Sequence, residues 1–121
     1  MTQYIGTDIV AIARIKQAIA RQGERFLRRI YTDAELRSYG RNPPSLAARF
    51  AGKEAVMKLL GARGKGLSFR EIEILSHPDG RPALSLYGRA KSEADKLGIK
   101  EIAVSLSHSK EYAIAAAIGA S

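Results

Sequence analysis

The sequence of 121 residues contains no cysteine. This absence excludes disulfides, thiol catalysis and any zinc or iron–sulfur site built on cysteine, and it is typical of a reducing compartment. No apolar run approaches the roughly 20 residues of a membrane span, and the N-terminus lacks the basic start and apolar block of a signal peptide. We therefore expect a cytoplasmic protein without a membrane span.

Acidic residues are scarce relative to basic ones. The chain has 12 Asp and Glu against 20 Lys and Arg, which gives a formal net charge of +8. Such a surface attracts polyanions, so the candidate partners are nucleic acid, an anionic membrane, a phosphorylated small molecule or an acidic protein. The apolar fraction of 45% is too high for a disordered basic tail, and the length fits one domain over residues 1–121.

The spacing of apolar residues predicts an α+β fold. Helical spacing covers residues 11–21, 24–30, 32–39, 46–60 and 88–97. Alternation or short apolar runs predict strands over residues 4–10, 69–75, 83–87, 101–107 and 112–118. Because helices cluster early and strands late, we expect a mainly antiparallel sheet packed against the long helix 46–60 and the shorter N-terminal helices.

Two breaks frame the long helix. The Asn-Pro-Pro run at residues 42–44 interrupts the chain, so we expect Ser45 to cap a helix that starts at residue 46. Residues 61–66 contain three glycines and two basic residues, a composition typical of a flexible loop. The helix between these breaks carries three of the candidate site residues.

Asp8 is unusual because aspartate is depleted in strands, and the residues around it suit a central strand. Gly6 lies on the same face and has no side chain, so a ligand or another backbone can come close to it. Asp8 is either a carboxylate of a functional site, or an edge-strand residue in water, or the N-cap of the next helix. The pattern alone leaves these alternatives open.

Glu54 and Lys58 lie four residues apart on the long helix and therefore share one face. Most such pairs are solvated ion pairs that contribute about 0.3 to 0.5 kcal/mol. The functional alternative is a carboxylate that ligates a metal beside an ammonium that neutralises phosphate.

His108 lies at the tip of the last predicted hairpin, between Ser107, Ser109 and Lys110. A loop histidine is usually solvated, but hydroxyls and a cation around it also suit a phosphate. Two carboxylates from separate elements, few histidines and no cysteine favour a hard cation such as Mg2+, which takes one or two carboxylates plus substrate phosphates and water. Together with Lys58, Arg49 and His108 they make a site for a polyphosphorylated ligand, and such a site suits phosphoryl-type transfer.

The first two predicted helices carry basic charge almost exclusively. The only acid between residues 9 and 31 is Glu24, while Arg14, Arg21 and Arg25 lie among several arginines. A face of one sign favours a negative partner. No aromatic-rich strand of the RNA-recognition type and no helix-turn-helix spacing is present, so an acidic protein fits at least as well as nucleic acid. A nucleic-acid-binding module without enzymatic activity is the alternative function.

Three motifs together resemble one family. Residues 5–10 read Ile-Gly-Thr-Asp-Ile-Val, residues 49–58 read Arg-Phe-Ala-Gly-Lys-Glu-Ala-Val-Met-Lys, and residues 104–113 read Val-Ser-Leu-Ser-His-Ser-Lys-Glu-Tyr-Ala. With Gly-Arg-Pro at residues 80–82, they resemble the holo-(acyl-carrier-protein) synthases, the short bacterial phosphopantetheinyl transferases, over essentially the whole chain. The resemblance implies transfer of the 4'-phosphopantetheine arm of coenzyme A to a serine of apo acyl carrier protein, with release of adenosine 3',5'-bisphosphate, for fatty-acid or polyketide biosynthesis.

The resemblance also implies roles for individual residues. Asp8 and Glu54 hold Mg2+ against the coenzyme A pyrophosphate, and Lys58 contacts the phosphates. The residues expected near the nucleotide and its 3'-phosphate are Arg49, His108 and Ser109, with Pro82 at the adenine. The acidic carrier protein is expected on Arg14, with Arg21 and Arg25 as helpers. The family is typically a homotrimer with sites in the clefts between subunits, and either Glu54 or a metal-held water is the proton acceptor.

The chain departs from the family pattern at three places. The loop at residues 61–66 is shorter than in many relatives and lacks their frequent Gly-Thr-Gly opening. Gly52 replaces a common alanine within the long helix, which costs up to about 1 kcal/mol of helix propensity. Ser109 stands where threonine is frequent, a change that keeps the hydroxyl. None of the three departures removes an expected metal ligand.

Overall fold

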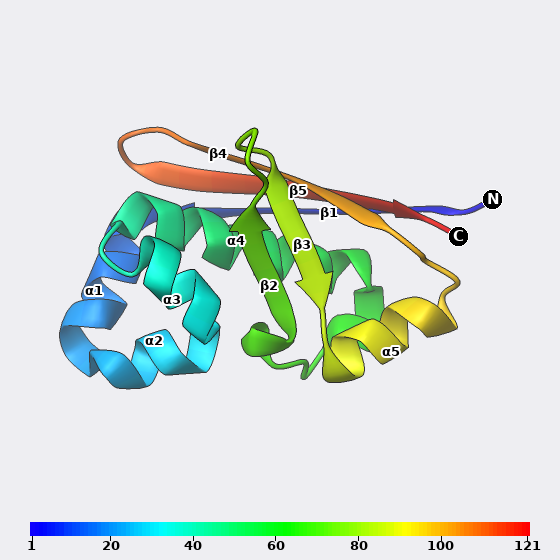
Figure 1. Ribbon diagram of the computed structural model, residues 1–121, viewed down its shortest axis with the longest axis horizontal. Coiled ribbons are helices and arrows are strands. Elements are labelled where there is room, and N and C mark those ends of the chain that lie inside the picture. The colour runs from blue at the N-terminus through cyan, green and yellow to red at the C-terminus, as the bar shows by residue number, and fades with distance from the viewer.

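The computed structural model describes residues 1–121 as two antiparallel sheets and five α-helices. The larger sheet has the strand order β1 (Gln3–Ala11), β5 (Tyr112–Ala120), β4 (Ile102–His108), and the smaller is the hairpin of β2 (Ile72–Ser76) and β3 (Pro82–Leu86). Figure 1 shows the long helix α4 (Pro43–Leu59) along one face of the larger sheet, with the hairpin crossing in front of it. This arrangement confirms the predicted α+β class with antiparallel sheets.

The remaining helices lie at the two ends of the molecule. Helices α1 (Ile12–Gln22), α2 (Glu24–Ile30) and α3 (Asp33–Tyr39) form one end, and α5 (Gly88–Lys96) lies at the other (Figure 1). The chain ends meet, because the Ser121 N–H donates to the Thr2 carbonyl at 2.9 Å. None of the helices has the length and apolarity needed to cross a membrane.

Every predicted helix and strand is present, but two local predictions are wrong. Helix α4 starts at Pro43 rather than residue 46, because the Asn42 side chain accepts from the Ser45 N–H at 3.1 Å and prolines fit the first turn, where no N–H partner is needed. Residues 69–71 form a 3₁₀ turn before β2, closed by a capping box between Ser68 and Glu71. Residues 61–64, within the predicted loop 61–66, form a second 3₁₀ turn.

Small residues let the larger sheet approach α4 closely. A Cβ on Gly6 would collide with the Ala55 carbonyl oxygen, so the other backbone expected near Gly6 is the helix itself. The inward positions of β5 are Ala113, Ala115 and Ala117, all buried. This close packing fixes the strand face that carries Asp8 against α4.

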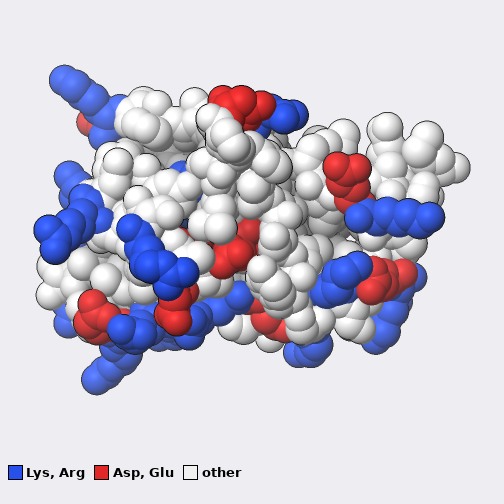
Figure 2. Space-filling view, in the orientation of Figure 1, with Lys and Arg blue, Asp and Glu red and all other residues white.

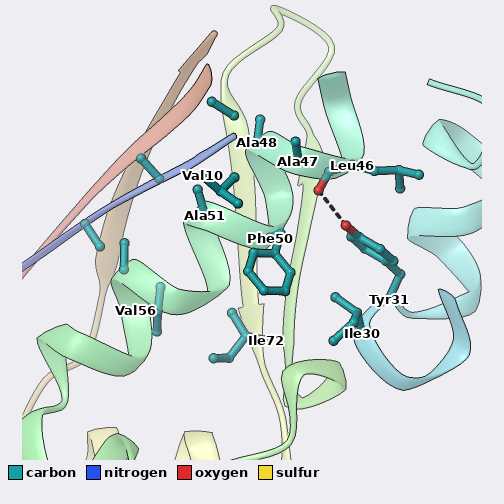
Figure 3. Packing of buried hydrophobic residues seen from close by; sticks show 14 of the residues in the cluster. Val10, Ile30, Tyr31, Leu46, Ala47, Ala48, Phe50, Ala51, Val56 and Ile72 are labelled. Atoms are coloured by element: carbon teal, nitrogen blue, oxygen red, sulfur yellow. Dashed lines mark hydrogen bonds between the residues drawn. The ribbon is translucent and has the colours of Figure 1, made fainter. Parts of the chain in front are cut away.

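Gly52 also has a structural reason. A Cβ there would meet the side chains of Ile74 and Leu106, which pack over the helix from β2 and β4. Helix α4 is therefore covered on both sides, and Figure 3 shows its residues packed between the sheet, the hairpin and the N-terminal helices. The loss of helix propensity at Gly52 is the cost of this packing.

The core contains polar groups that are fully paired. Figure 3 shows the Tyr31 hydroxyl donating to the Leu46 carbonyl, at 2.6 Å. Lys53 and Glu35 are both 0% exposed and form an ion pair with Nζ 2.7 Å from Oε1. The pair joins α4 to α3, and the other Glu35 oxygen accepts from the Ile74 N–H in β2 at 2.7 Å.

The outer face of the larger sheet has no cover within the chain. Large apolar side chains lie exposed on β1 and β5, between 46% and 69% accessible: Ile5, Ile9, Tyr112, Ile114 and Ile118. They occupy the strand positions that alternate with the buried alanines and glycines. An exposed apolar face of this kind marks an interaction surface.

Candidate active site

Asp8, Glu54 and Lys58 meet where β1 crosses α4. Asp8 extends from the inner face of β1, its side chain only 14% exposed, and Lys58 reaches it from α4 with Nζ 3.0 Å from Oδ1. The same ammonium donates to the Thr7 carbonyl at 3.0 Å. The expected neighbour of Lys58 was Glu54, but Lys58 pairs with Asp8, so the helical ion pair Glu54–Lys58 does not form.

Glu54 is half-buried beside this pair and accepts no hydrogen bond from the chain. Burial raises its pKa above the ordinary value, the Asp8 charge raises it further, and Arg14 and Lys58 act in the opposite direction. Two carboxylates thus converge from a strand and a helix, with a single ammonium in contact with one of them. A carboxylate without a hydrogen-bond donor from the chain, next to Asp8, fits a bound cation.

The donor set suits a hard divalent cation. No group of three or more His, Asp or Glu side chains lies close enough to enclose a metal. Mg2+ commonly binds through one or two carboxylates and takes its other oxygens from substrate phosphates and water. Asp8 and Glu54 therefore fit Mg2+ in an open site that a phosphorylated ligand completes.

A second cluster lies on the other side of α4. Arg49, Tyr39, Pro82 and His108 line a pocket of about 320 Å³, together with Ser45, Ser76 and Ser107. No Asp or Glu lines this pocket. Arg49, only 8% exposed, is thus a buried cation at the wall of a pocket without carboxylates, which suits an anionic ligand.

The predicted residues of the last hairpin are not equivalent. His108 lines the pocket at the end of β4, and its Nδ1 lies 3.3 Å from the Ser109 carbonyl. Ser109 does not line the pocket; its hydroxyl accepts from the N–H groups of Glu111 and Tyr112 at 3.3 and 3.2 Å. In this structure the Ser109 hydroxyl therefore closes the turn between β4 and β5.

The structure separates the residues that the sequence analysis combined into one site. Arg49 and Glu54 are five positions apart on α4, so they point about 140° apart around the helix axis. Neither Asp8, Glu54 nor Lys58 lines the Arg49 pocket. Across the sheet, Asp8 is opposite Ala115 in β5, which is in turn opposite Leu106 in β4. One chain therefore carries two half-sites. The carboxylate half-site consists of Asp8, Glu54 and Lys58. The anion half-site is the pocket lined by Arg49, Tyr39, Ser76, Pro82 and His108.

Tyr39 and Ser76 belong to the anion half-site and were not found by sequence reasoning. Tyr39 comes from α3 and Ser76 from the end of β2, and they contact Arg49 from 10 and 27 residues away in the sequence. The only signal in the sequence is the helical pattern that ends at Tyr39. That pattern does not show which side chain its last turn meets.

The basic face forms as expected, at one end of the molecule. Arg14, Arg21 and Arg25 are exposed on α1 and α2. Figure 2 shows Lys and Arg gathered over the end built by the N-terminal helices. Arg14 is the member closest to the carboxylate half-site, since it offsets the charge of Glu54 and its Cζ lies 5.8 Å from the Phe50 ring centre.

Comparison with known proteins finds relatives over nearly the whole chain. A model of the 4'-phosphopantetheinyl transferase superfamily matches residues 4–117. A holo-(acyl-carrier-protein) synthase of Dehalococcoides mccartyi is 59% identical over 112 residues, 93% of each chain. One of Herpetosiphon aurantiacus is 45% identical over 121 residues, covering 94% of this chain and 95% of the relative.

A solved structure matches the whole fold. The crystal structure of the Helicobacter pylori holo-(acyl-carrier-protein) synthase in complex with coenzyme A has a TM-score of 0.86 to this chain. It is 36% identical and covers 96% of this chain and 99% of its own. The chain therefore belongs to the 4'-phosphopantetheinyl transferase superfamily, as a transferase, and within it to the holo-(acyl-carrier-protein) synthases.

Proposed function

We propose that residues 1–121 form one transferase unit that moves the 4'-phosphopantetheine arm of coenzyme A to a serine of apo acyl carrier protein. The products are holo carrier and adenosine 3',5'-bisphosphate, the reaction depends on Mg2+, and it serves fatty-acid or polyketide biosynthesis in the cytoplasm. The convergence of Asp8 and Glu54 from β1 and α4 carries the proposal. The Helicobacter pylori relative, which is described in complex with coenzyme A, supports the choice of donor.

The carboxylate half-site performs the chemistry in this proposal. Asp8 and Glu54 would hold Mg2+, which supplies positive charge against the pyrophosphate of coenzyme A. Lys58 leaves Asp8 and neutralises phosphate oxygens. The carrier serine oxygen forms a bond to the phosphorus next to pantetheine while the bond to the bridging oxygen breaks, and Glu54 or a water takes the serine proton.

The anion half-site holds the nucleotide. Arg49 and His108 line the pocket that would receive the 3'-phosphate, and Pro82 forms the adjoining wall for adenine. Ser109 contributes indirectly, through the hairpin turn that positions His108. Because one chain keeps this pocket apart from Asp8 and Glu54, a complete site needs both half-sites brought together from different subunits.

A homotrimer meets that requirement. The apolar outer face of β1 and β5 supports subunit association, since large patches of this kind are rarely left in water. Cyclic symmetry would place the carboxylate half-site of each subunit against the anion half-site of the next. We expect Glu54→Ala and Arg49→Ala subunits, each defective alone, to recover about one quarter of the active sites when mixed equally in trimers. No recovery would place both half-sites of each active centre in one chain.

The basic face of α1 and α2 suits the acidic carrier. Arg14 lies closest to Glu54, where the carrier serine must arrive, and Arg21 and Arg25 extend the face away from it. Such charges steer association, and added salt weakens their effect.

Carrier modification tests the proposed function directly. The protein is incubated with coenzyme A, Mg2+ and an apo carrier, and the intact mass of the carrier should rise by one phosphopantetheine. Asp8→Ala and Glu54→Ala should abolish the transfer while the circular dichroism spectrum is unchanged, with Asp95→Ala on exposed α5 as the matched control. An unmodified carrier, or full activity of both site variants, contradicts the proposal.

A further inference from the structure

Arg49 is the one buried basic residue of this chain that has no acidic partner. The other, Lys53, is paired with Glu35, whereas no carboxylate lies within ion-pair distance of Arg49. A buried cation is costly unless an opposite charge or hydrogen bonds compensate it. Its guanidinium is therefore held by neutral groups and remains free to take an anion.

Three neutral groups fix that guanidinium. Arg49 Nε donates to the Ile74 carbonyl at 3.2 Å, and Nη2 donates to the Ser76 hydroxyl at 3.2 Å. The Tyr39 ring lies against the guanidinium plane, with its centre 3.7 Å from Cζ. The Tyr39 hydroxyl and the Ser76 hydroxyl are 2.7 Å apart, so the two residues also hold each other.

The contacts of Ile74, Ser76 and Tyr39 with the guanidinium form a clamp on Arg49. This clamp leaves part of the guanidinium available. An arginine side chain has five N–H donors, and Ile74 and Ser76 occupy two of them. Arg49 lines the pocket with His108, so the pocket is where a ligand can meet the remaining donors. Because the ring covers one face and two bonds hold one edge, the guanidinium cannot turn without breaking these contacts.

We propose that Tyr39 and Ser76 are positioning residues that aim Arg49 at the 3'-phosphate of the donor and so make the enzyme selective for coenzyme A over its 3'-dephospho form. The inference rests on the proposed function, in which this pocket receives the 3'-phosphate. A planar guanidinium held in place can donate two parallel hydrogen bonds to the oxygens of a phosphate monoester.

The selectivity follows from what each ligand leaves unpaired. A ligand with the 3'-phosphate compensates the buried Arg49 charge, and a ligand without it leaves that charge as it was. Loosening the clamp should therefore weaken only the first ligand, because the second makes no use of the orientation of Arg49. A residue that merely stabilised the fold would affect both ligands alike.

Binding of two nucleotides by the native oligomer tests the inference. Isothermal titration calorimetry gives the dissociation constants of adenosine 3',5'-bisphosphate and adenosine 5'-monophosphate, which differ only in the 3'-phosphate. For Ser76→Ala and for Tyr39→Leu, we expect about fivefold weaker binding of the bisphosphate, as for one lost hydrogen bond or cation–π contact, and unchanged binding of the monophosphate. Tyr39→Phe keeps the ring and should lose less than Tyr39→Leu.

Matched variants separate positioning from stability. Ser85→Ala on β3 and Tyr87→Phe remove hydroxyls of the same kinds outside the pocket, and they should leave both constants unchanged. Ser76→Thr keeps the hydroxyl and should restore the wild-type ratio. Ser76 is exposed at the end of β2, so Ser76→Ala tests the inference even where Tyr39→Leu fails to fold.

The outcomes distinguish this inference from the proposed function. An unchanged ratio of the two constants in Ser76→Ala overturns the positioning role, as does a wild-type protein that binds both nucleotides equally or neither. The carrier-modification assay decides the proposed function independently, because transfer to the carrier can succeed whether or not the 3'-phosphate is selected.

Discussion

Replacing Lys53 by methionine should destabilise the protein strongly. Lys53 Nζ donates to Glu35 Oε1 at 2.7 Å, to the Phe69 carbonyl at 3.1 Å and to the Ile72 carbonyl. Methionine fills a similar volume, so the loss is of charge and hydrogen bonds rather than of packing. The variant leaves a Glu35 carboxylate that is 0% exposed without its counter-ion, and two carbonyls without a donor.

The structure sets the size of the effect. Removing one partner of a buried ion pair costs about 3–5 kcal/mol. Unfolding entropies of about 2.1 cal/mol/K per residue, over 121 residues, convert this loss to a fall of about 12–20 °C in the unfolding midpoint. Differential scanning calorimetry at a fixed protein concentration, with wild type alongside, measures it.

Two further variants show whether the charge is the cause. Lys96→Met makes the same substitution at an exposed lysine, whose Nζ lies 3.3 Å from Glu93, and it should barely change the midpoint. Lys53→Met combined with Glu35→Gln should recover part of the loss, because no uncompensated buried charge remains. A midpoint of Lys53→Met within a few degrees of that of Lys96→Met would refute this account of the core.

Three other predictions concern the site and the basic face. Lys58→Met should bind Mn2+ about fivefold more tightly without coenzyme A, because the ammonium no longer competes at Asp8, and electron paramagnetic resonance titration measures this; equal affinity contradicts it. Glu54→Gln should raise the free energy of unfolding at pH 7 without metal by less than about 1 kcal/mol, since burial and then Asp8 raise the pKa of Glu54 above 4.5 in the fold. Because the pKa of Glu54 is higher in the folded state, the wild-type protein loses stability as the pH rises above 4.5. The gain in stability of Glu54→Gln should therefore vanish below pH 4.5, and a gain that persists in acid refutes the raised pKa as its cause. Arg21→Glu with Arg25→Glu should raise KM for the carrier severalfold at low salt and little at high salt, with kcat unchanged; a salt-independent KM argues against steering.

The fold could be predicted largely because its periodicities are strong. Alternating residues in β1 and helical spacing in α1 are local signals, and these two elements formed where the pattern placed them. The start of α4 was mispredicted because Asn42 and Ser45 are both good caps, and only the structure shows that the prolines fit the first turn. Local competition of this kind shifts helix ends by a few residues.

The site was predictable as a set of residues but not as an arrangement. Helical spacing makes Glu54 and Lys58 neighbours, yet Lys58 gains a carboxylate and a strand carbonyl by turning to β1, a contact across 50 residues of sequence. The clamp on Arg49 spans 27 residues to Ser76, and no local pattern encodes such a meeting. These long-range contacts depend on how the sheets cross α4, and the spacing of apolar residues along the chain does not predict that crossing.

Burial explains more about this molecule than its net charge does. The charge of +8 suggests only that some polyanion is bound. Within the fold, Lys53 is buried and neutralised by Glu35, so it adds nothing to the positive surface, and the more exposed Lys58 is paired with Asp8. Arg49 is different, because it is buried, held only by neutral groups, and faces a pocket without carboxylates. A buried cation without a counter-ion is costly, and an anion bound beside Arg49 would compensate this charge. The anion half-site therefore depends on this one arginine rather than on the excess of twenty basic residues over twelve acidic ones.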